Sequence, residues 1–259
     1  VRQTKLVIID EIHLLGEDRG PVLESVVSRV RYVSEQLIRE QKHTPSTTQK
    51  QGAASRCRIV GLSTALANAD DLASWLGCKS NASVFNFRPS VRPVPIEVHL
   101  AGFPGKHYCP RMQTMNKPTF AAIDRYSPFK PVLVFVSSRR QTRLTAFELI
   151  NYCTQDDNPY RFLMGSNANP NENTRRGSPQ EDMDAVCATV RDQALRRSLA
   201  FGIGIHHGGL SLHDRKTAES LFLEGKIQVL VCTATLAWGV NLPAHLVVLK
   251  GTEFFDGKT

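Results

Sequence analysis

Two adjacent carboxylates near the start of the chain are the first residues whose types suit catalysis. Asp10 and Glu11 directly follow the apolar run of residues 5–9, and His13 comes two positions later. The β-branched run predicts a strand of a parallel sheet, buried on both faces, whose carboxyl end lies where open α/β sheets bind ligands. One carboxylate there can hold Mg²⁺ through water and the next can orient an attacking water in nucleoside-triphosphate hydrolysis. Taken alone, the pair is more simply a solvated strand end.

Hydroxyl groups follow three further apolar runs, at residues 58–62, 131–136 and 228–232. The residues concerned are Ser63 and Thr64, Ser137 with Arg139, and Thr233 with Thr235. Hydroxyls and backbone amides at strand ends that lead into helices suit phosphate oxygens, and they contact charge without reading bases. Together they predict sequence-tolerant binding of a nucleic-acid backbone, although each pair alone is usually a turn or a helix cap.

Helical patterns separate these strands and must position their ends. After Gly20, the apolar residues at 22, 26, 30, 33 and 37 form one stripe, which predicts a helix that covers the sheet. Further helices are expected from Asn68 to Gly77, over residues 142–152, from Ser178 to Gly202 as one piece, and from Ser211 to Gly225. Prolines at 89, 93 and 95 predict a domain boundary near residue 90, followed by an extended segment over residues 94–100.

Composition restricts the class of protein. The 259 residues carry 32 Lys and Arg against 24 Asp and Glu, a net charge of +8 that favours polyanionic partners. No apolar run of about 18 residues and no signal-peptide pattern occurs, so neither a membrane span nor secretion is expected. The six cysteines lack metal-ligand spacing, which predicts reduced thiols of an intracellular protein rather than a zinc site or a disulfide framework.

These blocks, in this order, resemble the superfamily 2 nucleic-acid helicases, and within them the Ski-like, dual-cassette group. Residues 10–13 are similar to motif II, 63–65 to motif III, 134–140 to motif IV, 206–210 to motif IVa and 233–241 to motif V. The resemblance implies an α/β fold with two RecA-like parallel-sheet domains, both incomplete in this chain. Residues 1–90 would be the rear part of the ATP-binding domain and 91–259 most of the second domain, with flexible insertions at 41–55 and 164–177.

The resemblance also assigns roles. Asp10 would be the carboxylate associated with Mg²⁺ through water and Glu11 the catalytic one, while His13, Ser63 and Thr64 would couple the nucleotide site to nucleic acid. Gly239 and Asn241 would face the nucleotide. The expected backbone contacts are Ser137, Arg139, His207, Gly208, Thr233 and Thr235. ATP and Mg²⁺ are the implied cofactors. Single-stranded RNA or DNA, bound with 3′-to-5′ movement, is the implied partner, within a multiprotein complex of the nucleus or cytoplasm and away from membranes.

Two parts of a helicase are not seen in the sequence. The phosphate loop would lie upstream of motif II and the arginine-rich motif VI downstream of motif V, and Gly257-Lys258-Thr259 lacks the spacing of a phosphate loop. We therefore expect a fragment that does not hydrolyse ATP alone. The alternative function is a degenerate cassette that serves as a scaffold for nucleic acid or proteins, although the intact Asp10 and Glu11 argue against decay.

Overall fold

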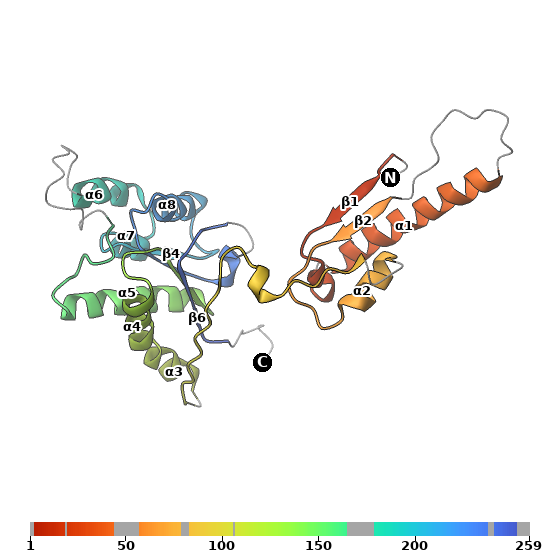
Figure 1. Cartoon of the computed structure of the whole chain (residues 1–259). Coiled ribbons are helices and arrows are strands. Elements are labelled where there is room, and N and C mark those ends of the chain that lie inside the picture. The colour runs from red at the N-terminus through yellow and green to blue at the C-terminus, as the bar shows by residue number, and fades with distance from the viewer. Residues whose placement is uncertain are drawn as a thin grey trace. The chain divides into compact units, whose positions relative to one another are not determined.

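The chain forms two α/β units, residues 1–99 and 100–259, in the computed structural model (Figure 1). The structure describes residues 3–18, 20–43, 57–78, 83–105, 107–164, 179–237 and 241–252. The units divide between His99 and Leu100, nine residues beyond the turn η3 (Pro89–Val91) near which the prolines predicted a boundary. Each unit contains a parallel sheet, so the predicted α/β class is confirmed.

Unit 1 is built on two parallel strands, β1 (Leu6–Ile9) and β2 (Arg58–Gly61), paired from Leu6 with Arg58 to Ile9 with Gly61. Helices α1 (Gly20–His43) and α2 (Ala69–Leu76) pack on the side of the strands that Ile9 faces. On the other side, Leu6 and Ile8 are 43% and 60% exposed. The apolar run therefore predicted the strand correctly but its second buried face wrongly, because the described part of unit 1 covers only one face.

The stripe predicted for α1 is confirmed at Val30 but wrong at its first two positions. Val22 and Val26 are 70% and 49% exposed, whereas Val27 and Val30 are buried. Apolar residues occur at both helical registers, and the packing against Ile9 selects the register of Val27. The helix runs through His43, so residues 41–43 do not belong to the insertion predicted for 41–55. Residues 44–56 lie outside the described part of the chain.

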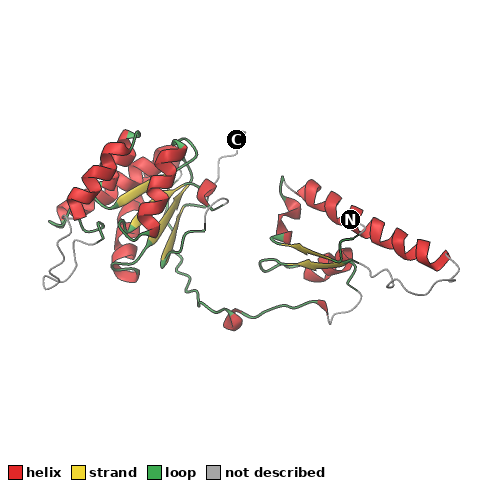
Figure 2. Cartoon of the chain, turned by 90° about the horizontal axis from the view of Figure 1, so that it is seen from above, coloured by secondary structure: helices red, strands yellow, loops and turns green. Residues whose placement is uncertain are grey.

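Unit 2 contains a four-stranded parallel sheet in the order β4, β5, β3, β6, seen on edge among its helices in Figure 2. The strands are β3 (Val132–Val136), β4 (Ile203–His206), β5 (Val229–Cys232) and β6 (Leu246–Lys250). Helices α4 (Asn116–Tyr126) and α5 (Arg139–Gln155) lie on one side of it, and α8 (Leu212–Leu223) on the other (Figure 1). Right-handed crossovers give this arrangement, because the β3-to-β4 and β4-to-β5 connections run in opposite directions across the sheet.

The helix predicted from Ser178 to Gly202 is in fact two helices, α6 (Pro179–Thr189) and α7 (Gln193–Leu199). The break has an electrostatic cause. The buried carboxylate of Asp214 accepts the backbone N–H groups of Arg191 and Asp192, each at 3.1 Å. Asp192 in turn caps α7 by accepting the N–H of Leu195 at 2.8 Å. Ser178 and the predicted insertion beyond Met164 lie outside the described residues, while the Met164 N–H donates to the Lys226 carbonyl.

Several features outside the sheets complete the description. Residues 94–100, predicted to be an extended segment, are exposed and belong to no helix or strand in the described part of the chain. The short helix α3 (Tyr108–Thr114) precedes α4. All six cysteines lie in described segments and are free; Cys109 is exposed, Cys78 half-buried and the other four buried. None of the described helices is long and apolar enough to cross a membrane.

Candidate functional site

In unit 1 the two strand ends are tied together by the backbone. The Leu62 N–H donates to the Ile9 carbonyl at 2.8 Å, and the Ile12 N–H donates to the Leu62 carbonyl at 2.9 Å. This interleaving brings the segment after β1, which carries Asp10 and Glu11, beside the segment after β2, which carries Ser63. The predicted meeting of these residues at one edge of the sheet is what the parallel pairing produces.

Glu11 adopts an unusual backbone conformation at this edge. Its φ of 55° and ψ of 44° lie in the left-handed region, which non-glycine residues occupy uncommonly. The Glu11 N–H donates to Asp10 Oδ1 at 3.0 Å, and η1 (Ile12–Gly16) begins immediately afterwards. Backbone conformations of this kind are concentrated at functional sites.

A chain of hydrogen bonds connects Glu11 to the segment after β2. His13 Nε2 lies 3.1 Å from Glu11 Oε2, and His13 Nδ1 lies 3.4 Å from Ser63 Oγ. When Nε2 donates to the carboxylate, the other nitrogen of the neutral ring accepts from the Ser63 hydroxyl. The imidazole therefore links the candidate catalytic carboxylate to the candidate coupling serine. Thr64 comes next in the chain and has an exposed side chain.

In unit 2 the expected backbone contacts gather at the carboxyl edge of the sheet. Ser137 follows β3, His207 follows β4 and Thr233 follows β5. Because these three strands are parallel neighbours, their carboxyl ends share one edge. The Thr233 N–H donates to the His206 carbonyl at 3.1 Å, which joins two of the three loops.

Ser137 meets a residue that the sequence reasoning missed. The half-buried phenol of Tyr108, on α3, makes a hydrogen bond with Ser137 Oγ. The next residue, Ser138, caps α5 by accepting the Gln141 N–H at 3.3 Å. No local sequence signal links Tyr108 to this edge, because the contact depends on how α3 packs in the folded unit.

His207 is held in one tautomer. Its Nδ1 accepts the Gly209 N–H at 3.1 Å, so the proton of the neutral ring lies on Nε2. Burial lowers the pKa of His207; Asp192 opposes this effect, while Arg139, Arg143 and the neighbouring His206 add to it. His207 is therefore neutral at physiological pH. The exposed guanidinium of Arg139 packs against Gly209, where a Cβ would come within 3.0 Å of its Nη1.

Thr233 and Thr235 share a hydrogen bond between their Oγ1 atoms at 2.9 Å. Thr233 is buried, whereas Thr235 is exposed and lies within η4 (Ala234–Leu236) rather than capping it. A Cβ at the exposed Gly208 would stand 4.0 Å from Thr235 Cγ2, so the two loops are in contact range. Asn241 is exposed, and Gly239 lies outside the described residues.

The side chain of His206, the residue before His207, does not belong to this group of strand-end contacts. His206 is 3% exposed and its Nε2 lies 2.7 Å from Glu219 Oε1 on α8. His206 is thus a packed histidine whose ring is paired with α8. Sequence reasoning missed the role of Asp214, whose carboxylate accepts the backbone N–H groups that follow α6.

Comparison with known proteins gives matches over the whole chain. Residues 173–254 match the family described as helicase conserved C-terminal domain. Over all 259 residues the chain is 57% identical to the DExH-box ATP-dependent RNA helicase DExH14 of Arabidopsis thaliana. It is 56% identical to activating signal cointegrator 1 complex subunit 3 of both Danio rerio and Homo sapiens.

The chain spans 11%, 15% and 10% of the lengths of these three relatives, respectively. The matches confirm the resemblance to helicases that the ordered motifs indicated, and the two parallel sheets agree with RecA-like domains.

Proposed function

We propose that this chain is the part of an ATP-dependent helicase that carries the hydrolytic carboxylates and much of the nucleic-acid contact surface. The observation that supports it most is the hydrogen-bond chain from Glu11 through His13 to Ser63. It joins two sequence motifs that are 50 residues apart at the edge of the sheet where ligands bind. The relatives' names, which include an ATP-dependent RNA helicase, support the same activity.

The two carboxylates, Asp10 and Glu11, have different roles in hydrolysis. Asp10 is exposed at the strand end and fits an association with Mg²⁺, because this ion binds through one or two carboxylates together with substrate phosphates and water. Magnesium bound there with ATP would neutralise charge on the phosphates. The described residues contain no group of three or more metal-ligating side chains, so they offer no separate all-protein cage. Glu11 orients the attacking water and accepts its proton.

His13 and Ser63 connect this chemistry to the nucleic acid. While His13 donates to Glu11, part of the carboxylate's accepting capacity is taken. A shift of the Ser63 loop, with Thr64 beside it, moves the imidazole of His13. This movement changes which oxygen lone pairs of the Glu11 carboxylate are free to accept a hydrogen bond from water. Hydrolysis is thereby coupled to events that displace the Ser63 loop.

Unit 2 binds the backbone of the single strand through Ser137, Arg139, His207, Gly208, Thr233 and Thr235. Gly239 and Asn241 contact the nucleotide. The strand is RNA or DNA, with 3′-to-5′ movement as the helicase resemblance implies; the Arabidopsis relative's name favours RNA. The animal relatives are named as subunits of a complex, so we extend the proposal to membership of a multiprotein assembly in the nucleus or cytoplasm.

The test is Glu11→Gln in the complete protein. Loss of the carboxylate should lower the rate of ATP turnover by several orders of magnitude and leave nucleotide binding largely intact, because Asp10 is retained. Steady-state ATPase assays and binding of a fluorescent ATP analogue measure the two effects. Turnover near the wild-type rate would favour the scaffold alternative instead.

A further inference from the structure

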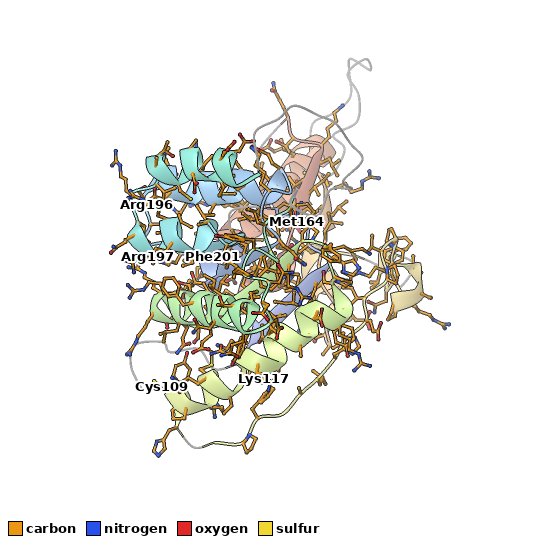
Figure 3. All side chains as sticks on the ribbon, turned by 90° about the vertical axis from the view of Figure 1, so that its left-hand side faces the viewer. Cys109, Lys117, Met164, Arg196, Arg197 and Phe201 are labelled. Carbon is orange, nitrogen blue, oxygen red and sulfur yellow. The ribbon has the colours of Figure 1, made fainter. Side chains whose placement is uncertain are left out.

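A groove lined by arginines lies beside the proposed backbone contacts of unit 2. It encloses about 370 Å³ between α5 and α7, and its charged walls are Arg140, Arg143 and Arg197. This volume falls within the roughly 300–1,000 Å³ of typical ligand pockets. Figure 3 shows Arg197 on α7, beside the ribbon of α5. We call it the arginine groove.

Charge and composition both point to a phosphate-bearing ligand. All three guanidinium groups are exposed, and the acidic residue of the lining, Asp192, already accepts the Leu195 N–H as the cap of α7. The rest of the lining includes Leu144 and the half-buried ring of Phe147. Guanidinium groups suit phosphates, and an apolar or aromatic surface suits the bases and sugars between them.

The groove adjoins the strand-end residues of unit 2, because its lining residue Arg140 directly follows Arg139. On α5, Arg143 stands one turn after Arg139. Arg143 and Arg139 both help to lower the pKa of His207. Asp192 acts on the same ring from the α7 side. A strand that leaves the Ser137 and His207 edge along α5 therefore reaches the arginine groove.

We infer that the arginine groove binds a further phosphate and nucleoside segment of the same single strand, which extends the footprint beyond the strand ends. The inference rests on the proposed nucleic-acid binding by unit 2. An acidic peptide offers matching charge as well, but it lacks a reason to occupy a groove that adjoins the strand-end residues.

The experiment uses Arg143→Gln, Arg197→Gln and the double variant in the complete protein, with Arg125→Gln as the matched control. Arg125 is also exposed but lies in the last turn of α4, outside the groove. Fluorescence anisotropy measures the affinity for labelled oligouridylates of increasing length, at several salt concentrations. Thermal melting reports on folding.

We expect each single variant to weaken the binding of long oligonucleotides roughly two- to fivefold, the size of an exposed ion pair, and the double variant by about tenfold. Each lost phosphate contact should reduce the slope of log affinity against log salt by about 0.7. The shortest oligonucleotides that still bind should be unaffected, and so should the Arg125→Gln control and the melting temperatures.

Three results would overturn the inference. Unchanged affinity for long strands in the double variant, while Thr235→Val still weakens binding, would remove the groove and leave the proposed function standing. Competition by oligoglutamate that depends on Arg143 and Arg197, without any effect on oligonucleotide affinity, would assign the groove to acidic peptides. Failure of the wild-type protein to bind any oligonucleotide would overturn the proposed function and the inference together.

Discussion

His13 links the two strand ends of unit 1 through contacts of its ring. The ring bonds Glu11 through one nitrogen and Ser63 through the other, so one side chain senses both loops. The backbone bonds between the same loops hold Ile12 and Leu62 independently of the ring. Removing the imidazole should therefore change the coupling and leave the loops in place.

His13→Ala in the complete helicase tests this division. We expect basal ATP turnover to persist and its stimulation by single-stranded RNA to fall severalfold, because Glu11 keeps its carboxylate but loses its connection to Ser63. A double-mutant cycle with Ser63→Ala should show coupling of roughly 0.5–3 kcal/mol in the stimulated rate. Strictly additive effects would contradict a direct link.

Thr235 and Thr233 are joined by a hydrogen bond in unit 2. Thr235→Val should weaken binding of unrelated single strands about equally, by roughly 1.5–3 kcal/mol, because a hydrogen bond to a charged phosphate is lost and no base is read. Its melting temperature should fall only slightly, because Thr235 is exposed and does not cap η4, although its hydrogen bond to Thr233 is also lost. Measuring affinity and melting temperature on one preparation decides the matter, and lost stability with unchanged binding would remove Thr235 from the site.

At the scale of elements, the sequence predicted strands well where an apolar run meets a polar end. β1, β2, β3 and β5 were expected from such runs. β4 was missed because its four residues include a glycine and a histidine, and β6 was missed although its apolar run ends on a lysine. The buried face of a helix was harder to predict. In α1, apolar residues occur at two helical registers, and only tertiary packing determines which of them is buried.

The candidate site divides in the same way. Residues that directly follow predicted strands, such as Asp10 and Ser137, could be placed at the sheet edge from sequence alone. Tyr108 could not be, because α3 reaches Ser137 only through the fold. The break between α6 and α7 likewise depends on Asp214, which is 22 and 23 residues away from the groups it accepts.

Asp214→Ala should weaken the junction between α6 and α7. The change leaves two backbone donors near a buried position without their acceptor, so we expect the free energy of unfolding to fall by about 1–3 kcal/mol. Urea denaturation of the chain measures it, with the exposed Asp184→Ala as the control. Equal stability of the two variants would show that the Asp214 bonds contribute little.

At the scale of the whole molecule, the buried Lys250 makes the stability of the chain depend on pH. Its Nζ donates to Asn116 Oδ1 and, at 2.8 Å, to Thr145 Oγ1, so it joins β6 to α4 and α5. Burial lowers the pKa of Lys250 from its ordinary value of 10.5 to about 8, although Glu148 opposes the shift. The folded chain therefore binds fewer protons than the unfolded chain between these two values.

Unfolding free energy should consequently contain a contribution that is constant below about pH 8, rises between about 8 and 10.5, and is constant above. Its slope is at most about 1.4 kcal/mol per pH unit. Urea titrations over this pH window give the free energy of unfolding at each pH. The values for wild type and Lys250→Met should diverge as the pH rises, with a slope up to that limit. The values for the exposed Lys117→Met should stay parallel to those of wild type. Parallel curves for Lys250→Met would show that the amine stays charged in the fold.

The distribution of thiols has a practical consequence for following this protein in solution. Cys109 is exposed on α3 (Figure 3), next to Tyr108, which bonds Ser137. Burial raises the pKa of Cys153 to about 11 and that of Cys232 to about 12, and it also raises that of Cys187, so these thiols hold little reactive thiolate. A maleimide dye added to the folded protein should therefore modify Cys109 first, as peptide mass spectrometry would reveal. The attached fluorophore would then report, without any mutation, on the arrival of a strand at the neighbouring Tyr108 and Ser137.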